Sequence, residues 1–285
     1  MKKFFNGWFK TKPPHGRALA SSAILTHYFP EIGLFSDVGL ERVDNQDSIG
    51  CLRFSDKRNF LVVLADGMGG HQGGEVASQI AVHTVQKSFP APDGSQDLIE
   101  TLQASFKTAN TAIYQLSLNT PELSGMGTTL VVLVVVNGLA YYANTGDSRL
   151  YWFRNGDCIQ LSRDHTRIAY MVETGLVPAE LASHHPDRHL LTRAIGTKID
   201  ENIEICYKPI PIELSDSFLL CSDGLYELVS NDEMNSVLNH YPAQEACQYL
   251  VELANNRGGY DNISVIVVKI TPNRPTINDG PITRV

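Results

Sequence analysis

Five aspartates of this chain stand where short, strand-like apolar runs end or begin, and they limit how the chain can fold. They are Asp47, Asp66, Asp147, Asp223 and Asp261. Each lies beside a polar turn, and three of the turns pair the acid with a glycine. Hard divalent cations prefer carboxylate oxygens as ligands. A fold that gathers these strand ends would therefore bind divalent cations, which indicates metal-assisted chemistry on a phosphate.

The order of the predicted elements favours an α+β domain with two packed sheets. Strands come in runs and helices come in runs, with strand runs on both sides of the helices, which is not the pattern of a doubly wound sheet. Asn137-Gly138 and Asn155-Gly156 are two-residue hairpin signals. Strands are predicted over residues 60–65, 128–136, 139–143, 149–154, 158–161, 217–221 and 263–270. Helices are predicted over residues 75–89, 97–118, 165–175 and 243–256, with a capping box that opens a short helix at Ser230.

One catalytic domain is expected over residues 31–272, between an N-terminal extension (1–30) and an irregular tail (273–285). Residues 1–12 combine lysines with Phe4, Phe5, Trp8 and Phe9, which would share one helical face. Two interpretations stay open: a tail that packs on the domain or stays disordered, and an anchor for peripheral contact with an anionic membrane surface.

Composition excludes several classes of protein. A net charge of −8 argues against nucleic-acid binding, which needs clustered Lys and Arg. The longest apolar run, residues 130–136, is far shorter than the roughly 20 residues of a transmembrane helix. The start lacks the apolar segment of a signal peptide. Five scattered cysteines without a CxxC pair are typical of reduced thiols, so we expect a cytoplasmic protein.

The string Ala65-Asp66-Gly67-Met68-Gly69-Gly70-His71 is the most specific motif. Its glycines allow a tight turn and close approach of the backbone to a ligand. It lacks Gly-Lys-Ser/Thr, so it is not a nucleotide-binding P-loop. Arg42 lies upstream in a charged loop, and its planar guanidinium suits a phosphate held by two parallel hydrogen bonds.

Taken together, these strings resemble the metal-dependent Ser/Thr protein phosphatases of type 2C, and most of all their compact bacterial members. The matching strings, in the order of the family, are Arg42 to Asp47, Asp66 to Ser78, Gly146 to Tyr151, Ser222 to Leu225 and Asp261 to Val265.

The resemblance implies a four-layer α-β-β-α sandwich, with two antiparallel sheets flanked by helices. It implies two Mn²⁺ or Mg²⁺ ions bridged by Asp66, with the Gly67 carbonyl on one of them. It further implies that Asp47, Asp223 and Asp261 bind the ions or their waters, that Asp147 helps to bind a third, weaker ion, and that Arg42 binds the substrate phosphate. Residues 165–189 correspond to a flap near the site.

Two residues depart from the pattern of eukaryotic members. Gln46 stands where those members often have glutamate, which makes the ligand role of Asp47 less defined. Met68 stands where they have a histidine proposed to protonate the leaving group. We do not assign that role to His71, since three residues further on it need not face the site.

The function so implied is hydrolysis of phosphoserine or phosphothreonine in a protein, the target of a Ser/Thr kinase, by a water that two ions activate. Two alternatives stay open: a phosphatase of small phosphorylated metabolites with the same site chemistry, and a non-catalytic phosphoprotein-binding module on the same fold. The module would be expected to have lost a metal ligand, whereas all five aspartates are present.

Overall fold

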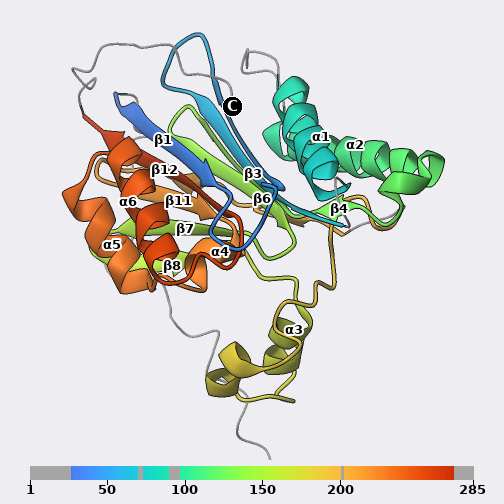
Figure 1. The fold of residues 1–285 in the computed structure, drawn as a ribbon. Coiled ribbons are helices and arrows are strands. Elements are labelled where there is room, and N and C mark those ends of the chain that lie inside the picture. Colours follow the sequence, from blue (N-terminus) through green and yellow to red (C-terminus); the bar gives the residue numbers. More distant parts are fainter. Residues whose placement is uncertain (1–26, 70–72, 90–96, 200–201, 273–285) are drawn as a thin grey trace, which may run out of the picture.

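The computed structural model describes residues 27–69, 73–89, 97–199 and 202–272 (Figure 1). The basic and aromatic stretch 1–12, His71 and the predicted tail 273–285 lie outside the described residues.

Two antiparallel sheets form the centre of the molecule. One has the strand order β1 (Phe29–Asp37), β12 (Ile263–Thr271), β11 (Ser217–Cys221), β7 (Arg149–Arg154) and β8 (Asp157–Gln160). The other has the order β10 (Ile210–Pro211), β6 (Leu139–Thr145), β5 (Leu130–Val136), β3 (Phe60–Met68) and β2 (Asp47–Arg53). In this second, seven-stranded sheet, β4 (Gly127–Thr128) pairs with β3 and β9 (Glu204–Ile205) with β6.

Helices cover the outer face of each sheet, so the molecule has four layers (Figure 1). The seven-stranded sheet packs against α1 (Gly73–Ser88) and α2 (Leu98–Asn119). The five-stranded sheet packs against α4 (Asp223–Tyr226), α5 (Asn231–His240) and α6 (Ala243–Asn256). Three short elements, η1 (Pro121–Leu123), α3 (Arg167–Glu173) and η2 (Ala179–His184), lie in the connections. The predicted α-β-β-α sandwich is confirmed.

Alternation along the central strands explains the layering. Successive side chains of a strand point to opposite faces of its sheet. In β3, Phe60 and Val62 face the other sheet, whereas Leu61 and Val63 face the helices. All four are fully buried, which is why this strand appears in the sequence as a continuous apolar run.

Local signals are mostly borne out. Asn137 and Gly138 have φ values of 53° and 75°, the left-handed pair that a tight hairpin requires. The capping box at Ser230 is present, with its hydroxyl accepting from the Glu233 amide. The predicted boundary at residue 31 falls inside β1, so Phe29 and Pro30 are part of the sheet rather than of the extension.

Candidate metal centre

The first two acids lie directly opposite each other on neighbouring strands. The antiparallel register of β2 and β3 pairs Asp47 with Asp66. Asp47 is buried, and the Ser222 hydroxyl donates to its Oδ2 at 2.8 Å. Its Oδ1 is also buried and has no hydrogen-bond partner among the described residues. A buried carboxylate oxygen without a partner is costly unless a cation or a proton balances it.

The next two acids come from the other sheet. Asp223 is the first residue of α4 and follows β11 after one residue, and Asp261 precedes β12 by two residues. Because β11 and β12 pair antiparallel, the end of the first and the start of the second lie at the same edge. The same topology that builds the sheet therefore brings together two acids 38 positions apart in the chain, since 261 − 223 = 38.

Asp147 lies in the turn that leads from β6 in one sheet to β7 in the other. Gly146 before it has a φ of 99°, and a Cβ there would lie 2.7 Å from the Thr129 side chain. The Thr129 hydroxyl accepts from the Asp66 amide at 2.8 Å and lies 2.6 Å from the Ser148 hydroxyl. This network fixes the Asp66 turn and the Asp147 turn relative to each other.

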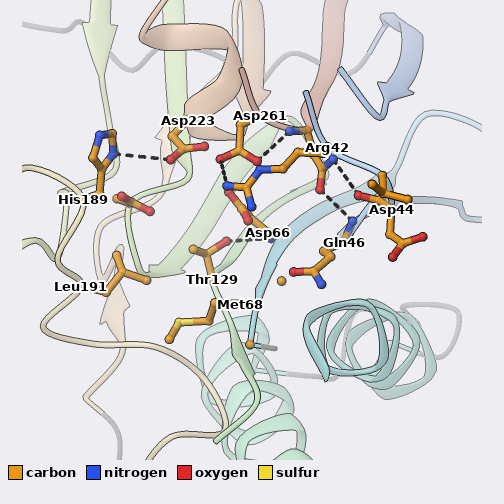
Figure 2. A pocket seen from close by; sticks show the side chains of 15 residues that line it. Arg42, Asp44, Gln46, Asp66, Met68, Thr129, His189, Leu191, Asp223 and Asp261 are labelled. Atoms are coloured by element: carbon orange, nitrogen blue, oxygen red, sulfur yellow. Dashed lines mark hydrogen bonds and ion pairs between the residues drawn. The ribbon is translucent and has the colours of Figure 1, made fainter. Parts of the chain in front are cut away.

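A cavity of about 440 Å³ opens over these turns (Figure 2). Four of the five predicted aspartates line it, namely Asp66, Asp147, Asp223 and Asp261, together with Gly67 and Arg42. Asp47 does not line the cavity, although it pairs with Asp66 across β2 and β3. Figure 2 shows Arg42 and Asp44 on one side of the cavity and His189 and Leu191 on the other.

Crowding and burial make these carboxyl groups difficult to ionise. Burial raises the pKa of Asp47 to about 6 and that of Asp147 to about 7. The pKa values of Asp66 and Asp223 are held well above the usual range, first by burial and then by the neighbouring aspartates. Divalent cations at this edge would remove both penalties, because they replace repulsion with attraction.

The geometry fits hydrated hard cations better than a closed cage. Among the described residues, no three Asp, Glu, His or Cys side chains converge tightly enough to hold one ion by themselves. Mg²⁺ keeps several waters and takes one or two carboxylates, whereas a structural zinc site is closed by four protein ligands. An open set of carboxylates with the unpartnered Oδ1 of Asp47 therefore suits Mg²⁺ or Mn²⁺.

Arg42 reaches the cavity from the loop between β1 and β2. Its Nη2 donates to Asp261 Oδ2 at 2.7 Å, and its side chain is 55% exposed. Asn262 holds this loop in place, although its role was not recognised from the sequence. Its side chain donates to the carbonyls of Val38 and Asp44, at 2.9 and 3.0 Å, and accepts from the Gln46 amide at 2.8 Å.

Gly67 allows the aspartate turn to touch the start of α1. A Cβ on Gly67 would lie 2.1 Å from the carbonyl oxygen of Gly74, so no other residue fits without a backbone shift. The Gly67 amide donates to the Gln46 carbonyl at 3.1 Å. The glycine thus matters for close approach between two backbone segments.

The predicted flap, residues 165–189, carries α3 and η2 and projects from the sandwich (Figure 1). Of its residues, His189 lines the cavity. At its end, His189 Nδ1 lies 3.3 Å from Glu227 and 4.0 Å from Asp223. At its start, the buried His165 accepts from the Gly146 amide through Nδ1 at 3.1 Å. Sequence reasoning assigned neither histidine a role, since contacts with the site arise only from the fold.

Comparisons with known proteins agree with this arrangement. The family model described as "Protein phosphatase 2C" matches residues 42–263. The "Serine/threonine phosphatase stp" of Listeria innocua is 35% identical over 238 residues, which cover 82% of this chain and 93% of that protein.

Two solved structures are also similar to this protein over most of the chain. The Mycobacterium tuberculosis phosphatase PstP/Ppp is 34% identical, with a TM-score of 0.76 over 85% of this chain and 99% of that one. A structure described as the catalytic domain of PstP with two manganese ions is 32% identical, with a TM-score of 0.73 over 86% of this chain and 99% of that one.

Proposed function

The chain belongs to the protein phosphatase 2C family, and from this premise we propose how its own residues carry out the family's reaction. The protein is a metal-dependent protein serine/threonine phosphatase whose cofactors are Mn²⁺ or Mg²⁺. The observation that supports the residue roles is the convergence of aspartates from both sheets on one cavity with an arginine at its rim.

Asp66 and the Gly67 carbonyl, with Asp223 and Asp261, would hold two ions, and Asp147 would hold a third, weaker one. Asp47 would act from the strand beside Asp66, by binding an ion through its unpartnered Oδ1 or by fixing a coordinated water. When bound, the ions supply the positive charge that activates a water and neutralises the phosphoryl oxygens.

Arg42 would bind and orient the substrate phosphate. Its guanidinium is more than half exposed and lies at the mouth of the cavity, within reach of an entering anion. Its partner Asp261 is itself a proposed metal ligand, so a bound ion would compete with Arg42 for that carboxylate. Competition of this kind would leave the two guanidinium edges free for phosphate oxygens.

Met68 lines the cavity at the position where eukaryotic members have histidine. A thioether cannot donate a proton, so protonation of the leaving group has to come from another source. A general acid has to be protonated to act, so we expect the pH–rate profile of this chain to lack the basic limb that such a histidine would give.

We propose that the substrates are proteins phosphorylated by a Ser/Thr kinase and that the enzyme acts in the cytoplasm. In the described part of the chain, the helices are too short or too polar to cross a bilayer. Hydrolysis of small phosphorylated metabolites remains the alternative, because the site chemistry would be the same. A non-catalytic binding module is disfavoured by the complete set of aspartates.

The test compares a phosphothreonine peptide with a small phosphoester, each in manganese, in magnesium and with chelator. Turnover of the peptide with metal and its loss with chelator are expected. Asp66→Ala and Asp223→Ala should each abolish turnover. Both variant proteins should remain folded, as measured by circular dichroism. Asp232→Ala, an exposed residue of α5, is the matched control. Full activity in both site variants would refute the assigned ligands, and turnover of the small phosphoester alone would favour the metabolite alternative.

A further inference from the structure

Three large apolar side chains stand exposed on the two chain segments that carry Arg42 and Asp261 to the cavity. Leu40, Val43 and Tyr260 expose 67%, 92% and 57% of their surface. Val43 lines the cavity itself, next to Arg42. Leu40 is two positions before Arg42, and Tyr260 directly precedes Asp261. We call these three residues the apolar rim.

A turn of two glycines places two of the rim residues, Leu40 and Tyr260, together. Gly258 and Gly259 have φ values of 131° and 51°, a conformation that other residues rarely adopt. The Leu40 amide donates to the Gly259 carbonyl at 2.8 Å. A Cβ on Gly259 would lie 3.0 Å from Leu40 Cγ, and one on Gly258 would lie 2.2 Å from the Tyr260 ring. Leu40 and Tyr260 thus lie against the same turn.

The side chains of the apolar rim are exposed to water, but hydrogen bonds of the backbone and of Asn262 hold the chain segments that carry them. Asn262 fixes the loop on both sides of the rim, through Val38 and Asp44. Single exposed apolar residues are common on protein surfaces and need no explanation. Here all three stand on chain segments that hydrogen bonds already hold in place beside the catalytic cavity. Binding a ligand there would therefore cost little loop entropy.

We propose that the apolar rim binds the polypeptide of the substrate beside its phosphorylated residue and selects an apolar side chain there. The proposal rests on the proposed function of the same site. A phosphate on Arg42 places the attached chain next to Val43, and an extended peptide advances about 3.3–3.6 Å per residue. Because Val43 adjoins Arg42, we expect the selected side chain to lie close in sequence to the phosphoresidue.

The charges beside the rim support a peptide of this kind. Glu41 and Asp44 are exposed on the same loop as Leu40 and Val43. They would repel acidic residues next to the phosphate, so an apolar or basic neighbour fits better than an acidic one.

The experiment measures kcat/KM of the full-length enzyme in manganese on matched phosphothreonine peptides. A single leucine replaces serine at each nearby position in turn, on both sides of the phosphothreonine. We expect at least one leucine peptide to exceed its serine partner by about fivefold to tenfold, the factor for removing part of one large apolar side chain from water. Leu40→Ser, Val43→Ser and Tyr260→Ser should each lower this ratio toward one.

Leu118→Ser is the matched control, because Leu118 is 61% exposed on α2 and does not line the cavity. It should keep the wild-type ratio. Equal turnover of all peptides by the wild-type enzyme, or an unchanged ratio in all three rim variants, would overturn the proposed role of the rim in substrate selection. Either result would leave the phosphatase assignment intact. Turnover of a small phosphoester with no peptide hydrolysed would overturn both. A dimer that Val43→Ser converts to a monomer in sedimentation would assign the rim to self-association and overturn the proposal.

Discussion

Replacing Asp47 with asparagine separates the stability of this fold from its metal chemistry. Asp47 is buried, accepts a hydrogen bond from Ser222 at 2.8 Å and has a second oxygen without a partner. Asparagine has nearly the same shape and can still accept from Ser222, but it cannot ionise. The substitution therefore removes a buried charge with little change in packing.

The size of the effect follows from the raised pKa. Burial first, and the neighbouring Asp261 charge to a lesser degree, raise the pKa of Asp47 from 3.8 to about 6. This difference corresponds to roughly 3 kcal/mol, at about 1.4 kcal/mol for each tenfold change. Below pH 4 the carboxyl group is protonated in both states and costs nothing. Between pH 4 and 6 it ionises in the unfolded chain first, so the free energy of unfolding falls as the pH rises, and above pH 6 the full cost is present.

Urea unfolding in chelator between pH 4 and pH 8 measures this cost. The wild-type protein should lose up to roughly 3 kcal/mol through Asp47 between pH 4 and 6, and Asp147, whose pKa is raised to about 7, should add a loss that begins in the same range and continues to about pH 7. Asp47→Asn should remove the contribution of Asp47 and make the decline between pH 4 and 6 shallower. At pH 8 it should be more stable than wild type by about 1–2 kcal/mol, since the unpaired amide N–H offsets part of the gain.

The effect of manganese on stability should differ between the wild-type protein and Asp47→Asn. Saturating Mn²⁺ should stabilise the wild-type protein more than the variant, because the cation balances the carboxylate and has less to bind in the amide. Asp232→Asn, on the exposed face of α5, should follow the wild-type profile. Superimposable pH profiles of wild type and Asp47→Asn in chelator would refute the reasoning.

Three further predictions concern the supports of the site. Asn262→Ala loses three hydrogen bonds and should lower the free energy of unfolding by about 2–4 kcal/mol and reduce kcat/KM, as measured by urea unfolding and peptide kinetics; a loss near zero would contradict the anchoring role. Gly67→Ala should cost more than about 2 kcal/mol in the same unfolding assay, because its Cβ would lie 2.1 Å from the Gly74 carbonyl oxygen, and a fully stable variant would show that the turn can shift. His165→Leu should lower kcat more than His165→Asn, which keeps an acceptor for the Gly146 amide, and equal kinetics would exclude that hydrogen bond. Burial lowers the pKa of His165 to about 4, so neither variant should move the pH–rate profile near neutrality.

The strongest elements could be predicted because sequence and environment agree there. Strand β5 is buried on both faces and appears as an unbroken apolar run, and β12 contains such a run from Val265 to Val268. The hairpins at Asn137 and Asn155 need left-handed residues, and asparagine followed by glycine supplies them. Four of the five acids stood out for the same reason, since Asp66, Asp147, Asp223 and Asp261 each follow or precede a predicted strand, whereas Asp47 begins β2.

Strands β1 and β2 were not predicted as elements, and their composition explains why. In both, many residues are only half-buried, so neither shows a continuous apolar run or a clean alternation. Gly33 interrupts β1, and the reason is tertiary: a Cβ there would lie 2.4 Å from the backbone of Ala243 in α6. β1 exists because β12 supplies a partner along its whole length, from Phe29 to Asp37.

The position of the site between the sheets connects stability with catalysis. Asp47 and Asp66 belong to the seven-stranded sheet, whereas Asp223 and Asp261 lie at an edge of the five-stranded one. Elsewhere the two sheets meet through an apolar core that includes Phe60, Phe218 and Ile266, but at this edge like charges face each other. Repulsion there opposes sheet packing until cations intervene, and the same cations are the cofactors of hydrolysis. The carboxylates that weaken the metal-free fold are therefore those that the reaction needs, and replacing them with neutral residues should stabilise the metal-free fold at the expense of activity.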